Sequence, residues 1–235
     1  MKKNVKVILS PLLLNEEKIT NKIVVVVDIL RASSTILTLF HKKVKYAIPT
    51  DNLKECKKYK KKGFLTIAER MGRKVEGFDF GNSPSKLMNE NLAGKKIAMC
   101  TSNGTKSIIK CKKFNKVLIG CFLNFKYLTK YLMEKNSDIL ILCSGRKESL
   151  SLEDTLFAGA LVESLSKYFK IKSDSSYLSR KLYLESKSNI LDIMMNSSHS
   201  KKLSSYKNVI DIEFCSQQSI FELIPIFSEN KLILL

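Results

Sequence analysis

A repeating order of short apolar run, polar loop and helix-like segment is the feature of this sequence that most constrains its fold. Runs such as 23–27 are apolar at every position, as expected for central strands of a parallel sheet covered on both faces. Strands alternating with helices predict an α/β protein, here a three-layer α/β/α arrangement with a largely parallel or mixed central sheet. The predicted strands are 5–9, 23–28, 44–48, 64–68, 97–100, 117–121 and 139–143. The predicted helices are 33–41, 52–61, 84–89, 105–112 and 125–135.

The pattern changes after Asp154. Two longer helices are predicted at 156–170 and 176–195, and two strands at 209–214 and 220–227. Pro225 interrupts the last strand, which suits an edge position because proline cannot donate a ladder hydrogen bond. A chain of 235 residues could form one large domain or two lobes. We expect a single α/β domain spanning 1–235, in which the residues after about 165 form at most a smaller C-terminal lobe.

Composition bears on the compartment. No apolar run approaches the roughly 18 to 20 residues that span a bilayer, so no transmembrane segment is expected. No membrane partner is expected either. The apolar start is similar to a short signal peptide, but polar residues interrupt it and no small-residue cleavage site follows, which favours a first β-strand. The six cysteines form no Cys-x-x-Cys pair, and several lie inside apolar runs. We therefore expect buried free thiols in a reducing cytoplasm.

The formal net charge of +19 suggests, at face value, a nucleic acid or an anionic membrane as partner. The 36 lysines are spread along the whole chain, however, which favours a diffuse solvated surface and no nucleic-acid partner. Four of the five arginines lie instead in loop-like segments rich in glycine and acids: Arg31, Arg70, Arg73 and Arg146. Because a planar guanidinium offers paired donors that match phosphate or carboxylate oxygens, these arginines indicate anion recognition.

Residues that directly follow predicted strands are the candidates for a functional site, because ligands of open α/β sheets bind beyond the carboxyl ends of the strands. The first such segment, 27–35, places Asp28 at the end of a strand and Arg31 just before a helix. Asp28 could ligate a metal or attack phosphorus, and Arg31 could hold an anion. The simpler alternative is an aspartate that caps the helix and pairs with Arg31.

The second segment, 68–84, contains three glycines, two arginines and three acids in a stretch too long for a plain turn. Long structured loops in compact domains are usually functional, although a surface loop with solvated charges is the competing interpretation. The candidates in this segment are Glu69, Arg70, Arg73, Asn82 and Ser83.

The third segment, 99–106, leads from a strand through small residues into a helix. Its N–H and hydroxyl groups could cradle a phosphate, whereas a plain capped turn is the alternative. The candidates are Thr101, Asn103, Gly104 and Thr105. The spacing of Cys100 and Lys106 is similar to the Cys-x5-Arg loop of cysteine phosphatases. Because lysine stands where that mechanism needs arginine, a thiol nucleophile is not favoured.

The fourth segment carries Arg146 and then the adjacent acids Glu153 and Asp154 at the start of a helix. The helix dipole favours acids in a first turn, so capping alone explains one of the two acids. A role in a metal site is the alternative that remains for the pair. Two histidines supply little for a zinc cluster or a Ser-His-Asp triad. What remains, carboxylates, arginines and anion-cradling loops, suits a hard divalent cation and a phosphorylated substrate.

Four blocks, taken together, resemble the 2-phosphosulfolactate phosphatase family. They are VDILRASST at 27–35, ERMGRKVEGFDFGNSP at 69–84, TSNGTK at 101–106 and EDTLFAGA at 153–160, in the family's order, and the resemblance thins after about residue 165. The resemblance implies the α/β layering expected above. It also implies Mg²⁺-dependent hydrolysis of 2-phospho-3-sulfolactate to 3-sulfolactate and phosphate, a step towards coenzyme M or free sulfolactate.

Residue chemistry and resemblance together lead to a set of expected roles. The expected catalytic residues are Asp28, Arg31, Glu69 and Asp154, and the expected Mg²⁺ ligands are Asp28 with Glu69 or Asp154. The expected substrate-binding residues are Arg70, Arg73, Asn82, Ser83, Thr101, Asn103, Gly104, Thr105 and Arg146. The expected partner is a small anionic phosphorylated substrate. One alternative is a Mg²⁺-dependent phosphatase that acts on another small phosphorylated acid. The other alternative is a basic protein that binds nucleic acid. The attacking group and the oligomeric state are left open, with a homo-oligomer among the alternatives.

Overall fold

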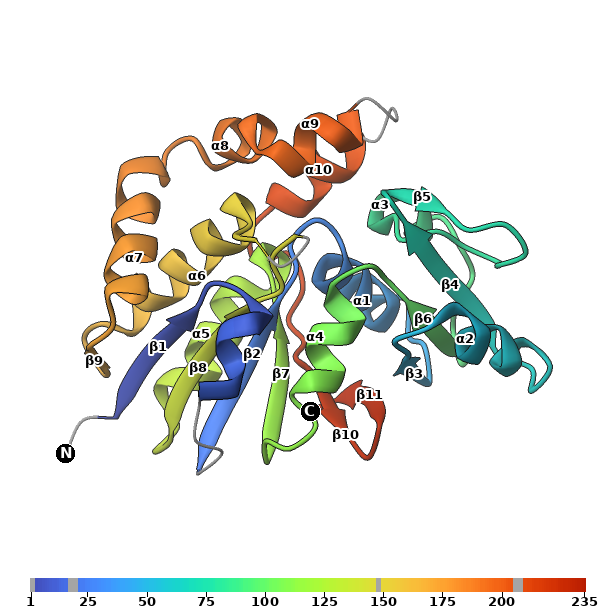
Figure 1. The fold of residues 1–235 in the computed structure, drawn as a ribbon, viewed down its shortest axis with the longest axis horizontal. Helices are drawn as coiled ribbons and strands as arrows, with labels where there is room; N and C mark the ends of the chain where they lie inside the picture. The colour runs from blue at the N-terminus through green and yellow to red at the C-terminus, as the bar shows by residue number, and fades with distance from the viewer. Residues whose placement is uncertain (1–2, 17–20, 147–148, 205–208) are drawn as a thin grey trace.

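The structure, a computed structural model, describes residues 3–16, 21–146, 149–204 and 209–235 and is built around one twisted mixed sheet (Figure 1). Its strands are β1 (Asn4–Ile8), β2 (Lys22–Val27), β3 (Tyr46–Pro49), β4 (Leu65–Arg70), β5 (Arg73–Lys74), β6 (Lys96–Cys100), β7 (Lys116–Gly120), β8 (Asp138–Cys143), β9 (Lys170–Ile171), β10 (Pro225–Ser228) and β11 (Lys231–Leu234). Within the described ranges they form an eleven-stranded sheet in the order β5-β4-β6-β3-β11-β10-β7-β2-β8-β1-β9.

Two parallel blocks make up most of the sheet. In one block β2 pairs with β7 and β8, and β8 pairs with β1; in the other, β6 pairs with β3 and β4. The C-terminal β10–β11 hairpin joins the blocks, because β10 pairs antiparallel with β7 and β11 pairs antiparallel with β3. The predicted edge position of Pro225 is therefore wrong. Proline is tolerated inside the sheet here because Pro225 is the first residue of its strand.

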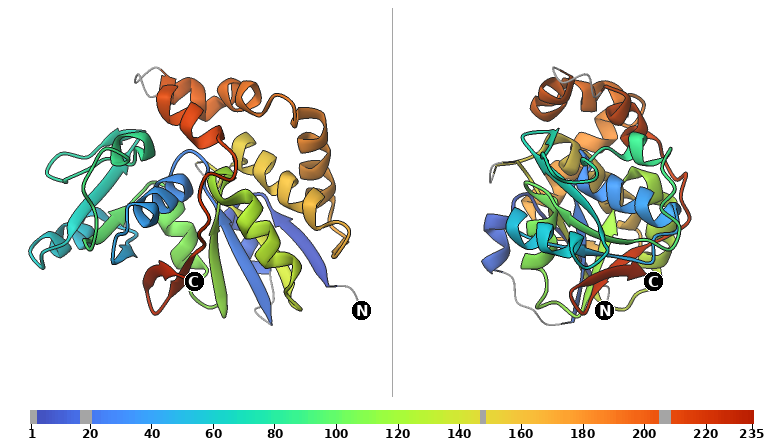
Figure 2. Two further views of the ribbon diagram at one scale, coloured as in Figure 1. Left: turned by 180° about the vertical axis from the view of Figure 1, so that it is seen from behind. Right: turned by 90° about the vertical axis from the view of Figure 1, so that its right-hand side faces the viewer.

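Helices cover both faces of the sheet, which confirms the α/β/α class. They are α1 (Ala32–His41), α2 (Leu53–Lys60), α3 (Pro84–Leu87), α4 (Gly104–Lys110), α5 (Phe125–Met133), α6 (Leu152–Leu165), α7 (Asp174–Ser186), α8 (Ile190–Asn196), α9 (Ser198–Ser204) and α10 (Val209–Ser216), with 3₁₀ turns η1 (Pro11–Glu16) and η2 (Phe122–Asn124). Helices α1 and α5 lie on one face, and η1 and α4 on the other (Figures 1 and 2). Helices α8 to α10 cross the top of the view in Figure 1, beyond the carboxyl ends of the central strands.

The core is continuous from β1 to the C-terminal hairpin. In β2, the side chains of 24–27 are at most 1% exposed, as expected for a β-branched strand packed on both faces. All six cysteines are buried free thiols, as predicted. Among the helices of the described residues, none combines the length and the apolar composition that crossing a bilayer requires. The single-domain arrangement stays a prediction.

Predictions for the C-terminal third are partly wrong. Residues 209–214 belong to helix α10 and not to a strand, and the helix predicted over 176–195 is divided into α7 and α8. Only the end of the strand predicted at 220–227 exists, as β10. The alternating apolar and polar residues of 209–214 favour a strand locally. In the fold, however, Asp211, Ile212 and Cys215 are buried together, a spacing that only one face of a helix provides.

Helix α6 begins four residues earlier than predicted. The hydroxyl of Ser151 accepts a hydrogen bond from the Asp154 N–H and caps the helix, so the adjacent acids lie in its first turn. Further along α6, a β-carbon at Gly159 would collide with the backbone carbonyl oxygen of Ser179 in α7. Glycine therefore allows the close packing of α6 against α7, and this pair holds the first turn of α6 near the ends of the central strands.

Candidate active site

A small pocket of about 110 Å³ lies where the chain leaves the carboxyl ends of β2, β4, β6 and β8, next to α9. The strand-end location predicted from the sequence is thus where the structure has a pocket. Its lining includes seven predicted site residues, Asp28, Arg31, Glu69, Asn82, Thr101, Asn103 and Arg146. The remaining lining residues are Leu30, Met71, Gly72, Ser102, His199, Lys202 and Leu203.

Asp28 lies at the end of β2 and is 7% exposed. Its Oδ1 accepts a hydrogen bond from the Ala32 N–H at 3.1 Å, so the capping role considered from the sequence exists in part. Burial raises the pKa of Asp28 to about 6; the neighbouring charges of Glu69 and Glu153 add to this effect, and His199 and the Ala32 N–H oppose it. The carboxylate form is therefore poorly stabilised by the protein alone.

Arg31 does not pair with Asp28. Its Nη1 forms a buried ion pair with Asp211 Oδ2 at 2.5 Å, and its Nη2 donates to the Gly72 carbonyl at 2.8 Å. Asp211 was assigned no role from the sequence; it lies in α10, where a strand was predicted. No local sequence signal identifies this partner, because it lies 180 residues from Arg31.

Glu69 joins two loops of the pocket. Its Oε1 accepts from the Gly72 N–H at 2.5 Å, and its Oε2 accepts from the Ser102 N–H at 3.2 Å. The β4–β5 turn between these strands is Met71-Gly72, with φ of 56° and 84°. A two-residue turn in which both φ values are positive matches the twist of the two strands of a hairpin. Glycine adopts a positive φ readily, so it is favoured in such a turn. The long loop predicted at 68–84 therefore begins as a hairpin.

The loop between β6 and α4 is closed by two reciprocal bonds: Thr101 N–H donates to Thr105 Oγ1 and Thr105 N–H donates to Thr101 Oγ1, each at 3.0 Å. Thr105 is fully buried and does not line the pocket, whereas Thr101 and Asn103 do. Gly104 lies behind the pocket, against Asp28. The loop thus presents two of its four predicted residues to the pocket.

Three other predicted binding residues lie outside the pocket lining. Arg70 donates to the Glu69 carbonyl at 2.7 Å and to Cys100 Sγ at 3.2 Å. Arg73 is opposite Arg70 in the β4–β5 register and is exposed. Ser83 donates its hydroxyl to Asp211 Oδ1 at 2.8 Å. Arg70 and Ser83 therefore support residues of the wall, and their roles in binding stay predictions, as does that of Arg73.

The two adjacent acids of α6 have different environments. Asp154 Oδ1 accepts from the Ile29 N–H at 2.8 Å and Oδ2 accepts from the Gly145 N–H at 3.2 Å, so this side chain connects the segments that follow β2 and β8. Burial and the charges of Asp28 and Glu153 raise the pKa of Asp154 well above its ordinary range. Asp154 is not among the residues that line the pocket.

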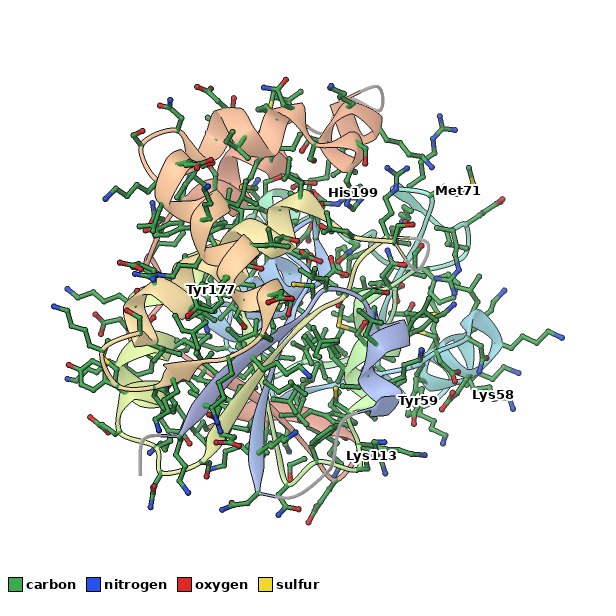
Figure 3. All side chains as sticks on the ribbon, turned by 60° about the vertical axis from the view of Figure 1, so that its left-hand side comes forward. Lys58, Tyr59, Met71, Lys113, Tyr177 and His199 are labelled. Atoms are coloured by element: carbon green, nitrogen blue, oxygen red, sulfur yellow. The ribbon has the colours of Figure 1, made fainter. Side chains whose placement is uncertain are left out.

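Glu153 is 1% exposed, and its Oε1 lies 3.0 Å from Nδ1 of His199. Burial alone would raise the pKa of Glu153, but the hydrogen bond and charge of His199 outweigh it and lower the pKa. His199 also lines the pocket, and Figure 3 shows it between the C-terminal helices and the β4–β5 turn that carries Met71. His199 was not predicted as a site residue, because two histidines are too few for a zinc cluster or a Ser-His-Asp triad.

The predicted Mg²⁺ ligands Asp28, Glu69 and Asp154 do not all surround one point in the structure. Across the described ranges, no group of three or more His, Cys, Asp and Glu side chains has the geometry of a metal site, so Asp28, Glu69 and Asp154 do not form a three-carboxylate cage. Mg²⁺, however, keeps several waters and typically uses only one or two protein carboxylates. Asn82 Oδ1 and Glu153 Oε2 are buried oxygens without a hydrogen-bond partner in the described part of the chain. Asn82 lines the pocket together with Asp28, and the charge of Glu153 acts on Asp28. Oxygens of this kind are the ligands that a hard cation takes.

A mixed α/β sheet with acids, an arginine and a small-residue loop at its strand ends defines an α/β enzyme with its site at the carboxyl edge of the sheet. Residues 8–230 match the family described as 2-phosphosulpholactate phosphatase. The chain belongs to this phosphatase family, which confirms the resemblance found in the sequence and extends it past residue 165.

Individual relatives agree with this membership. Proteins named "Probable 2-phosphosulfolactate phosphatase" are similar to nearly the whole chain. The protein of Thermotoga maritima is 37% identical over 211 residues, 89% of this chain and 91% of the relative. The protein of Caldanaerobacter subterraneus subsp. tengcongensis is 35% identical over 217 residues, 90% of each chain. The protein of Clostridium botulinum (strain Alaska E43 / Type E3) is 32% identical over 238 residues, 97% of this chain and 98% of the relative.

Proposed function

We propose that this protein is a Mg²⁺-dependent phosphatase that hydrolyses 2-phospho-3-sulfolactate to 3-sulfolactate and phosphate. The family and the names of its relatives support this substrate. The observation that carries the proposal is that Asp28 and Arg31 line one small pocket together with Thr101 and Asn103. A carboxylate for a cation and donors for an anion are the two requirements of metal-assisted phosphoester hydrolysis.

Asp28 and Glu69 are the residues that would hold Mg²⁺. Both line the pocket, and Asp154 does not. When bound, Mg²⁺ would offset the charge of the dianionic phosphoryl group and stabilise the leaving oxygen. Asp154 would then act as a support that fixes the chain on either side of Asp28.

The remaining residues of the pocket would bind and orient the substrate. A guanidinium has five N–H donors, so the bonds of Arg31 to Asp211 and Gly72 leave donors for phosphoryl oxygens. Asn103 would orient the phosphoryl group through its side-chain amide and backbone N–H, and Thr101 through its hydroxyl. Arg146 lines the pocket, and its Nη1 donates a hydrogen bond to the Ser198 carbonyl oxygen at 3.0 Å. This arginine would bind the sulfonate or the carboxylate of the substrate.

The decisive experiment is a phosphate-release assay on purified protein with 2-phospho-3-sulfolactate, phospholactate, 2-phosphoglycerate and 3-phosphoglycerate, each with Mg²⁺ or with EDTA. We expect the highest kcat/KM for 2-phospho-3-sulfolactate, loss of activity in EDTA and recovery with added Mg²⁺. Higher kcat/KM for another acid would reassign the substrate. Activity that persists in EDTA would exclude the metal, and no release from any of the four would overturn the function.

We also propose a cytoplasmic location, supported by six buried free thiols, which a reducing compartment preserves. Cell fractionation followed by immunoblotting tests this location, and recovery in a secreted fraction would contradict it. A homo-oligomer remains a prediction, and sedimentation equilibrium measures it directly.

A further inference from the structure

Asp211 is a buried carboxylate that contacts separate parts of the pocket wall. It lies in α10 and is 1% exposed. Its Oδ2 pairs with Arg31 Nη1, and its Oδ1 accepts from Ser83 Oγ at 2.8 Å, from Ser85 Oγ at 2.5 Å and from the Ser85 N–H at 3.2 Å. One side chain of the C-terminal helices therefore holds both the segment after β2 and the start of α3.

The surroundings of Arg31 restrict its guanidinium to one orientation. Nη1 is bound by Asp211 on α10, and Nη2 is bound by the Gly72 carbonyl in the β4–β5 turn. Two bonds to different elements fix the plane of the group, which a single contact would leave free to rotate. The Arg31 side chain is also 4% exposed, so little solvent competes for its remaining donors.

The hydrogen bonds to Oδ1 of Asp211 affect how much positive charge Arg31 retains for an anion in the pocket. Three donors from Ser83 and Ser85 share the negative charge of Asp211. These donors all bind Oδ1 and polarise the carboxylate towards that oxygen, whereas Arg31 contacts Oδ2. The guanidinium is thereby oriented by Asp211 and retains attraction for an anion in the pocket.

We propose that Asp211 is a positioning residue, which holds Arg31 so that its remaining N–H donors face the pocket and bind phosphoryl oxygens. This inference rests on the proposed function, because it assigns to Arg31 the binding of a phosphoryl group. It makes α10 part of the binding site, although Asp211 itself is not among the residues that line the pocket.

Binding of inorganic phosphate, measured by isothermal titration calorimetry in the presence of Mg²⁺, tests the proposal. We expect Asp211→Asn to weaken phosphate binding by about tenfold and to raise KM for 2-phospho-3-sulfolactate by a similar factor, with a smaller change in kcat. Glu213→Gln, on the same helix, is the matched control and leaves both quantities unchanged.

A double-mutant cycle separates positioning from a general structural role. In an Arg31→Met background, Asp211→Asn should weaken phosphate binding no further, because no guanidinium remains to be oriented. The double variant should also recover the melting temperature lost in the single variants, since no charge is left buried without its partner. An equal loss of phosphate affinity with and without Arg31, or an Asp211→Asn variant that binds phosphate as the wild type does, overturns the inference.

Ser85→Ala covers the case in which Asp211→Asn does not fold, because it removes one donor to Asp211 and keeps the ion pair. We expect two- to fivefold weaker phosphate binding, and unchanged binding overturns the inference. The two proposals fail differently. Wild-type protein that binds phosphate, with the expected cycle, and hydrolyses none of the four substrates refutes only the function. Wild-type turnover with an unaffected Asp211→Asn variant refutes only the role of Asp211.

Discussion

Gly104 lies directly against the carboxylate of Asp28: a β-carbon at position 104 would be 2.6 Å from Asp28 Oδ2 and would also collide with the β-carbon of Ala32. The start of α4 and the end of β2 are therefore closer than any side chain at position 104 allows. The backbone conformation of Gly104 is one that other residues also adopt, so conformation does not require glycine here. Glycine is required because the space between the two elements has no room for a side chain.

Gly104→Ala should displace Asp28 from its position in the pocket. We expect kcat/KM for 2-phospho-3-sulfolactate to fall at least tenfold, and the free energy of unfolding to fall by about 1 to 3 kcal/mol because of overpacking. Steady-state kinetics and urea denaturation measure the two effects. Lys106→Ala, at an exposed position of the same helix, is the control and should change neither. Wild-type kinetics for Gly104→Ala would show that the position of Asp28 is not critical.

Asp28→Asn should stabilise the metal-free protein at high pH. The pKa of Asp28 is raised, mainly by burial, from 3.8 to about 6. A carboxyl with a higher pKa in the folded than in the unfolded state loses stability as pH rises from about 4 to about 6, and the loss persists above that range. At about 1.4 kcal/mol for one pKa unit, the cost is roughly 3 kcal/mol at pH 8. In EDTA we expect Asp28→Asn to melt several degrees above wild type at pH 8 and at the same temperature at pH 4.

Added Mg²⁺ should narrow this difference. We expect Mg²⁺ to raise the melting temperature of wild type at pH 8 and to leave that of Asp28→Asn unchanged, because the variant lacks the charged ligand. Turnover of the variant should be lost. Differential scanning fluorimetry at both pH values measures the melting temperatures, and an equal Mg²⁺ response of the two proteins would remove Asp28 from the metal site.

Glu69→Gln and Asp154→Asn should separate metal binding from support. Glu69 lines the pocket, so Glu69→Gln should raise the Mg²⁺ concentration for half-maximal activity tenfold or more. Asp154→Asn should leave this concentration within about twofold. The opposite ranking in Mg²⁺ titrations would make Asp154 the ligand.

His199→Ala should destabilise the protein near neutral pH more than in acid. His199 lowers the pKa of Glu153 below its ordinary value of 4.5, so the pair contributes stability above about pH 4.5 that is lost as pH falls through the lowered pKa. In the variant, burial of Glu153 is left uncompensated at pH 7 and matters little at pH 4. Thermal melts at the two pH values measure this difference, for which His41→Ala is the control. An equal effect of His199→Ala at both would contradict the pairing.

Local pattern was sufficient for the parallel strands because each is a short, uniformly apolar run, and burial on both faces requires little else. Every strand predicted before residue 144 exists, within a few residues of its predicted ends. The segment 209–214 was mistaken for a strand because its alternation is a local property, whereas its helical face is selected by packing. Ile212 and Cys215 are buried in the core cluster and Asp211 by its bonds to Arg31 and Ser83.

By itself, the sequence determined the α/β class, the family and the strand-end residues Asp28, Glu69, Thr101 and Asn103 of the pocket. Strand ends are adjacent in space whatever the details of the packing, so their polar residues can be found by reading along the chain. Only the tertiary structure decided which groups hold those residues in place. Asp211 reaches Arg31, and His199 reaches Glu153, from helices that fold back over the strand ends. Gly104 likewise owes its importance to the distance between two elements, which no local pattern of residues encodes.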